Sequence, residues 1–145
     1  MFKMKRALFG LLLASSLVSG CGQFGDLLGP GTLVTLVNNG DFDVIATVAF
    51  SDDPNISESD LIDSGSEIEL TIPANDTRSF RRGCLSMRAV MVENAELQVI
   101  GGFGPSTRSE VIREGQGNPQ MICQGFLSFT FDHNDSTLDF DVTAD

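Results

Sequence analysis

Hydrophobic and polar residues alternate in a series of short runs between residue 32 and residue 145. The alternation is cleanest over residues 67–72, where Ile68, Leu70 and Ile72 are separated by polar residues. Successive side chains of an extended chain point to opposite faces, so this pattern predicts a β-strand with one buried face and one face in water.

Similar runs predict further strands, separated by polar turn signals. These strands cover residues 32–37, 44–50, 77–82, 85–92, 97–100, 126–131 and 138–142. The Asn-Asn-Gly-Asp segment at 38–41 predicts a hairpin between the first two, because Asn and Gly accept the positive φ of a tight turn. A turn at 73–76 predicts a second hairpin in which Glu69 faces Arg81, and the segment 132–135 joins the last two strands.

Two of the segments between the predicted strands have helical signatures. Residues 107–110, Thr-Arg-Ser-Glu, match a capping box, and Gly115 is placed to end the helix. Residues 57–63, which end before Gly65, give a weaker version of the same signal. Each predicts only a short helical turn.

Seven to eight short strands without an internal repeat predict an all-β fold, an antiparallel β-sandwich of immunoglobulin-like type with one or two helical turns. A small closed barrel is the alternative. The length of the segment 32–145 suits a single domain with a hydrophobic core and is too short for two.

The first 20 residues have a different pattern. Lys3, Lys5 and Arg6 precede an apolar stretch at residues 7–18, which is the layout of a secretory signal. This stretch is shorter than the ~20 residues that a helix needs to cross a bilayer. We therefore expect residues 1–20 to be a signal peptide that is removed on export.

The segment Leu17-Val18-Ser19-Gly20-Cys21 resembles the lipobox of bacterial lipoproteins, which has an aliphatic residue, two small residues and then cysteine. The resemblance covers residues 1–21 and implies that Cys21 is lipidated and becomes the first mature residue. Residues 21–31, rich in glycine, would then be a flexible tether with a root-mean-square reach of about 17 Å. Gly22 after the cysteine implies sorting to the outer membrane. An ordinary signal peptide, cleaved near a cysteine, is the alternative.

Of the three cysteines, a lipidated Cys21 leaves Cys84 and Cys123 as an even pair. Exported proteins meet an oxidising compartment, so these two are predicted to form a disulfide. Closing a loop of about 40 residues would stabilise the fold by about 4 kcal/mol.

Charge sets limits on the partners. Removing the three positive charges of the signal takes the formal net charge from −11 to −14, and a body of this charge repels nucleic acid and anionic surfaces. The absence of Trp and Tyr argues against carbohydrate recognition, because sugar-binding sandwiches stack sugar rings on exposed aromatic side chains.

The sequence offers little catalytic chemistry. His133 is the only histidine, and it lies in a polar segment without a nucleophile motif nearby, so no catalytic residue is predicted. Soft ligands are too few for a zinc site. No cofactor is expected, with calcium as a weak candidate at oxygen ligands spaced like the start of an EF-hand loop, which lacks that loop's glycine and closing glutamate. The ligands with this spacing are Asp53, Asn55 and Ser57, and Asp60 is a further candidate ligand of the same irregular site.

Four of the six mature arginines fall within eleven residues: Arg78, Arg81, Arg82 and Arg88. Such a cluster suits a carboxylate, a phosphate or an acidic partner, because Arg binds these groups in bidentate fashion. Pairing with neighbouring acidic residues across the sheet explains the same charges.

The expected function is that of a membrane-anchored envelope lipoprotein, a non-enzymatic interaction or structural module with an envelope protein as partner. The alternative is a β-sandwich that binds a small ligand or calcium in the cell envelope.

Overall fold

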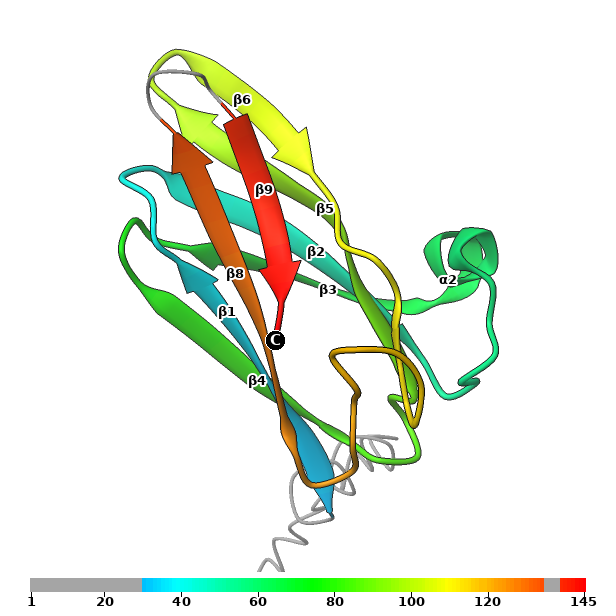
Figure 1. The fold of residues 1–145 in the computed structure, drawn as a ribbon. Coiled ribbons are helices and arrows are strands. Elements are labelled where there is room, and N and C mark those ends of the chain that lie inside the picture. The colour runs from blue at the N-terminus through cyan, green and yellow to red at the C-terminus, as the bar shows by residue number, and fades with distance from the viewer. Residues whose placement is uncertain (1–29, 135–138) are drawn as a thin grey trace, which may run out of the picture.

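The computed structural model describes residues 30–134 and 139–145. The proposed signal peptide, Cys21 and most of the tether lie outside these residues. The described part is mostly β-structure with one short helix (Figure 1). Its elements are β1 (Gly31–Asn38), β2 (Asp43–Ser51), α2 (Glu58–Ser64), β3 (Ser66–Ile72), β4 (Thr77–Gly83), β5 (Ala89–Val99), β6 (Gly102–Thr107), β7 (Ile112–Arg113), β8 (Phe126–Asn134) and β9 (Asp139–Ala144).

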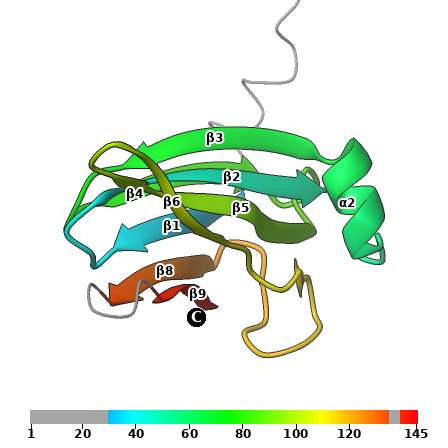
Figure 2. The ribbon, with the colours of Figure 1, turned by 90° about the horizontal axis from the view of Figure 1, so that it is seen from above.

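The strands form two separate sheets that lie face to face as two layers (Figure 2). Sheet A has the order β4-β1-β8-β9, and sheet B has the order β3-β2-β5-β6, with β7 paired to β5. No hydrogen-bonded ladder joins the two sheets within the described residues. The fold is therefore a sandwich of two sheets, as the strand pattern predicts, and the closed barrel is not observed.

The alternating residues of both sheets meet in one hydrophobic core. Phe129 and Phe131 of β8 are almost completely buried and belong to the same cluster as Val44 and Val48 of β2. A smaller cluster on the outer face of sheet B holds α2 in place through Leu61. Burial of one apolar face per strand is what the period-2 pattern demands.

Both predicted hairpins are wrong in the same way. The segment 38–41 leads from β1 in sheet A to β2 in sheet B, and the turn at 73–76 leads from β3 in sheet B back to β4 in sheet A. Glu69 therefore pairs with Thr47 of β2, while Arg81 pairs with Leu33 of β1. Both turns carry the chain between the layers.

The side chain of Asn38 explains why the chain crosses here. It is almost fully buried, and its Nδ2 donates hydrogen bonds to the carbonyl oxygens of Phe42, Ile72 and Pro73 at 2.8, 3.2 and 3.1 Å. Its Oδ1 accepts a hydrogen bond from the Gly40 amide at 2.9 Å. One amide side chain thus satisfies backbone groups of both crossing loops, which would otherwise be buried without partners.

Three other expectations need correction. Residues 85–92 and 97–100 are not two strands, because β5 is continuous over 89–99 and a register shift opposite Thr47 and Val48 absorbs the break in its alternation. Residues 107–110 form no helix; Ser109 instead exchanges backbone and side-chain hydrogen bonds with Val92. One pairing, β1 with β8, is parallel, so the sheets are not wholly antiparallel.

The remaining local predictions agree with the structure in part. The weaker helical signal is confirmed as α2, with Ser57 as its N-cap and Gly65 as its C-cap. The last two predicted strands are confirmed as the antiparallel pair of β8 and β9, although β8 runs on to Asn134, farther than predicted. Strands β6 and β7 were not predicted. Strand β6 contains Gly and Pro, which are rare in strands, and β7 has only two residues.

Candidate functional site

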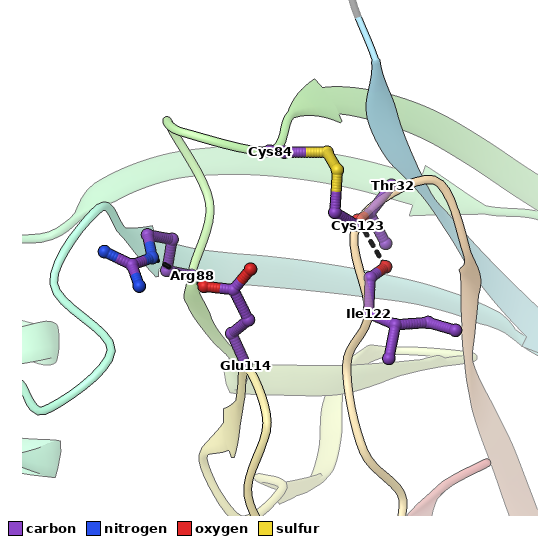
Figure 3. Close-up of a disulfide and its surroundings, with 6 residues drawn as sticks. All are labelled: Thr32, Cys84, Arg88, Glu114, Ile122 and Cys123. Atoms are coloured by element: carbon purple, nitrogen blue, oxygen red, sulfur yellow. Dashed lines mark hydrogen bonds and ion pairs between the residues drawn. A yellow bond between two sulfur atoms is a disulfide. The ribbon is translucent and has the colours of Figure 1, made fainter.

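The predicted disulfide is present and marks one end of the sandwich. Cys84 directly follows β4 and Cys123 precedes β8, so the bridge joins two loops that are 39 residues apart in sequence (Figure 3). The Cα atoms of the two cysteines are 5.2 Å apart, which is a normal separation for a bridged pair.

The first described residues of the chain are fixed beside this bridge. The Cys84 amide donates a hydrogen bond to the Pro30 carbonyl at 3.1 Å. One residue into β1 after Gly31, the Thr32 hydroxyl donates to the Ile122 carbonyl at 3.0 Å (Figure 3). The segment that would connect the domain to Cys21 therefore enters the fold at the disulfide end.

Two of the four clustered arginines have carboxylate partners. Arg88 Nε lies 2.6 Å from Glu114 Oε2, between the β4–β5 and β7–β8 loops (Figure 3). Arg78 Nη1 lies 2.8 Å from Asp76 Oδ2 in the turn before β4. The pKa of Asp76 is lowered, mainly by the hydrogen bond from the Thr77 amide and further by the charge of Arg78, while desolvation opposes the shift.

The other two arginines lie on opposite sides of β4. Arg82 stacks its guanidinium over the rings of Phe50 and Phe80, 5.1 and 5.8 Å from the centroids, at the edge of the core. Arg81 is exposed on the outer face of sheet A, in register with Leu33. The four arginines thus occupy different settings, and only Arg81 combines high exposure with a place beside the disulfide end.

The calcium candidates lie in the loop before α2 and at its start. Asp53 Oδ1 accepts a hydrogen bond from the Asn55 amide at 2.8 Å. The Ser57 hydroxyl accepts from the Asp60 amide at 3.1 Å and lies 2.6 Å from Asp60 Oδ2. These contacts are those of an Asx turn and a helix cap. In the residues that the structure describes, no group of three or more His, Cys, Asp or Glu side chains could hold a metal ion.

His133, the only histidine, and Phe103, an exposed aromatic residue, both lie away from the bridge. His133 lies near the end of β8, where its ring packs against Phe42 with centroids 5.4 Å apart. Phe103 lies near the start of β6, just after Ile100 in the β5–β6 turn, and this turn is at the opposite end of the sandwich from the start of β1 (Figure 1). Both Phe103 and Ile100 are exposed.

One carboxylate on the outer face of sheet B is poorly solvated. Glu93 Oε2 is buried and has no hydrogen-bond partner among the described residues. Burial raises the pKa of Glu93, and the negative charge of Glu67 raises it further. This carboxylate therefore costs stability when it is ionised.

Two depressions are open to solvent and contain one carboxylate each. The first, of about 370 Å³, lies between the end of α2 and the β4–β5 loop, with Asp52 and Leu85 in its wall. The second, of about 320 Å³, lies between Glu110, Pro119 and the end of β9. Neither brings together a nucleophile, a base and an orienting group, the arrangement that covalent catalysis uses.

The disulfide end also carries an exposed apolar surface that the sequence patterns did not indicate. Its large hydrophobic side chains and their exposed fractions are Leu33 (39 %), Leu85 (84 %), Ile122 (56 %) and Phe126 (78 %). A signal for this surface exists in the sequence, because residues 77–92 and 115–131 contain no Asp or Glu in a strongly acidic chain.

The described residues include no helix that is long and apolar enough to cross a membrane.

Comparison with known proteins adds little. No protein-family model matches the chain, and no curated protein is detectably similar to it in sequence. A solved structure described as the NMR structure of the protein from Eubacterium rectale is similar to it with a TM-score of 0.44 and 14 % identity, over 79 % of this chain and 87 % of that one. Any functional proposal therefore rests on the residues of this chain.

Proposed function

We propose that the chain is an exported lipoprotein whose Cys21 is lipidated and whose β-sandwich acts as a non-enzymatic interaction or structural module of the cell envelope. The observation that carries this proposal is the Cys84–Cys123 bridge. A structural disulfide is typical of exported proteins, and it leaves Cys21, in the lipobox-like segment, as the only remaining cysteine of the three.

The position of Pro30 supports the anchor. The described chain starts at the disulfide end, so a lipid on Cys21 would hold this end of the sandwich near the bilayer, at a root-mean-square distance of about 17 Å for a flexible tether. Sorting to the outer membrane, implied by Gly22, and the immunoglobulin-like class of the sandwich are further parts of the proposal.

A module that works through its surface suits the two open depressions with their isolated carboxylates, Asp52 and Glu110. Binding of a small ligand or calcium at the loop before α2 is the second candidate. Titration with Ca²⁺ separates the two, because an ion that binds specifically must raise the melting temperature of the folded domain.

The experiment that tests the anchor is metabolic labelling with an alkyne-tagged fatty acid, followed by membrane fractionation. The wild-type protein should carry the label and sediment with membranes. Cys21→Ser should lose the label and become soluble, with an unchanged melting curve, because residue 21 precedes the folded domain. The double variant Cys84→Ala/Cys123→Ala is the control and should keep the label. A labelled or membrane-bound Cys21→Ser protein contradicts the proposal.

A further inference from the structure

Five exposed residues gather around the point where the chain enters the sandwich, and together they form what we call the tether-end surface. Its members are Leu33, Arg81, Leu85, Ile122 and Phe126. Exposed hydrophobic side chains are common when scattered singly, but a group of them on one end of a domain marks a contact surface.

Hydrogen-bond register brings the outer-face members together. Leu33 of β1 lies opposite Arg81 of β4 on one side and in register with Phe126 of β8 on the other. Side chains of neighbouring strands in register are about 5 Å apart and can touch. This row of Arg, Leu and Phe therefore crosses the outer face of sheet A at its disulfide end.

The bridge adds the two loop residues. Ile122 precedes Cys123, and its side chain packs close to Gly125, where an added Cβ would lie only 2.6 Å from Ile122 Cγ1. The Leu33 amide donates to the Gly125 carbonyl at 3.1 Å, so this loop is fixed against β1. Leu85 follows Cys84 on the other side of the bridge.

The charge distribution sets this end apart from the rest of the molecule. Three segments meet at it, residues 30–40, 77–92 and 115–131, and none contains an Asp or Glu, although the chain has 20. The opposite end of sheet A is acidic, with exposed Asp132 and Asp141 paired in register. We therefore expect less repulsion from anionic lipids at the disulfide end than at the end that carries Asp132 and Asp141.

Three acidic residues lie near the surface, and one of them, Glu114, is paired with Arg88. Asp52 lies in the wall of the depression beside Leu85. Asp145 pairs through its backbone with Ser128, two residues along β8 from Phe126. The row formed by Arg81, Leu33 and Phe126 itself contains no carboxylate.

We propose that the tether-end surface rests on the lipid bilayer that holds the anchor, with Phe126, Ile122 and Leu33 inserted at the headgroup boundary and Arg81 placed against lipid phosphates. This rests on the proposed function, since Cys21 supplies the anchor. The bilayer is favoured as the occupant because the tether enters the fold at this surface and is short. Tethering gives a millimolar effective concentration, so a small apolar patch with one cation suffices for docking.

Fluorescence quenching by lipids tests this docking. The chain contains no Trp, so Phe126→Trp places a single indole in the surface, and Phe103→Trp places one at the far end as the matched control. Because Cys84 and Cys123 are bridged, the Cys21 thiol of the mature chain couples specifically to a maleimide-bearing lipid. The vesicles contain phosphatidylethanolamine with a minority of phosphatidylglycerol, with or without bromine on the acyl chains.

In brominated vesicles, Phe126→Trp should lose about half or more of its emission, because an indole at the interface is within contact range of the quencher. Phe103→Trp should be unaffected. Adding Ile122→Ser should weaken docking about five-fold, from the apolar area that it no longer buries, whereas Ile100→Ser at the far end should change nothing. Both isoleucines are exposed, so neither change threatens folding.

Equal quenching of the two indoles, or quenching of neither, would overturn the docking. An emission of Phe126→Trp that is already blue-shifted without vesicles would overturn it too, and would point to the chain's own tether or a second copy as the occupant. Sedimentation distinguishes those two. The chemical coupling does not depend on native lipidation, so failure of the anchor in cells and failure of docking on vesicles are separate results.

Discussion

Replacing both bridged cysteines with alanine should destabilise the domain by about 4 kcal/mol. The bridge closes a loop across a sequence separation of 39 residues, and the chain-entropy relation gives about 13 cal/mol/K for a loop of this size, or about 4 kcal/mol at room temperature. With an m-value of about 1.5–2 kcal/mol/M, the urea midpoint should fall by about 2–3 M.

This cost should arise in the unfolded state. In the folded state the two loops are also fixed by the bond from the Cys84 amide to Pro30 and by the bond from Thr32 to Ile122. We therefore expect Cys84→Ala/Cys123→Ala to keep the far-ultraviolet circular dichroism of the wild type. Chemical reduction of the wild type should lower its midpoint by a similar amount.

Urea unfolding followed by circular dichroism measures both effects, in a Cys21→Ser background that removes the other thiol. A loss of less than about 1 kcal/mol would refute the loop-closure reasoning, because even short closed loops exceed this value. A fall in the m-value would show instead that the reference state had changed its compactness.

Three further changes test other parts of the structure. Asn38→Asp should cost about 3 kcal/mol or more in urea unfolding, because a carboxylate would face three carbonyl oxygens, while the neighbouring change Asn39→Ala, which removes one exposed hydrogen bond to Asp132, should cost less than about 1 kcal/mol. Arg82→Ala should cost about 1 kcal/mol through its lost ring contacts, and Arg81→Ala should be close to neutral; equal losses would contradict the stacking. Because the pKa of Glu93 is raised in the folded state, its penalty is absent below the unfolded-state pKa and complete above the folded-state pKa. Glu93→Gln should therefore stabilise the domain at pH 7 and not at pH 3, and a gain independent of pH would contradict this assignment.

The strands that the sequence predicted correctly are those whose burial alternates along one segment. In β3, Ile68, Leu70 and Ile72 face the core because polar residues separate them, and no distant contact is needed to infer it. The same holds for β8 with Leu127, Phe129 and Phe131. The disulfide could also be predicted, because the expected lipidation of Cys21 leaves Cys84 and Cys123 as one pair.

The pairing between strands could not be predicted from the sequence. The turn signals at 38–41 and 73–76 were read correctly as turns, but a turn signal does not say whether the next strand joins the same sheet or the opposite one. Asn38 decides this through hydrogen bonds to residues 34 and 35 positions away in sequence. The capping box at 107–110 was overridden in a similar way, because the Ser109 amide donates to the Val92 carbonyl and the Ser109 hydroxyl accepts from the Val92 amide, 17 residues away in sequence.

The sequence by itself determined the strands with clean alternation, the short helix, the acidic charge and the cysteine pair, because each depends on neighbouring residues or on a count. Only the tertiary structure decided the sheet partners, the parallel pairing of β1 with β8 and the tether-end surface. Leu33, Arg81 and Phe126 lie in three distant segments, and only the hydrogen-bond register of sheet A places them in one row. Contacts of this kind are set by the packing of the whole chain, which a local pattern does not encode.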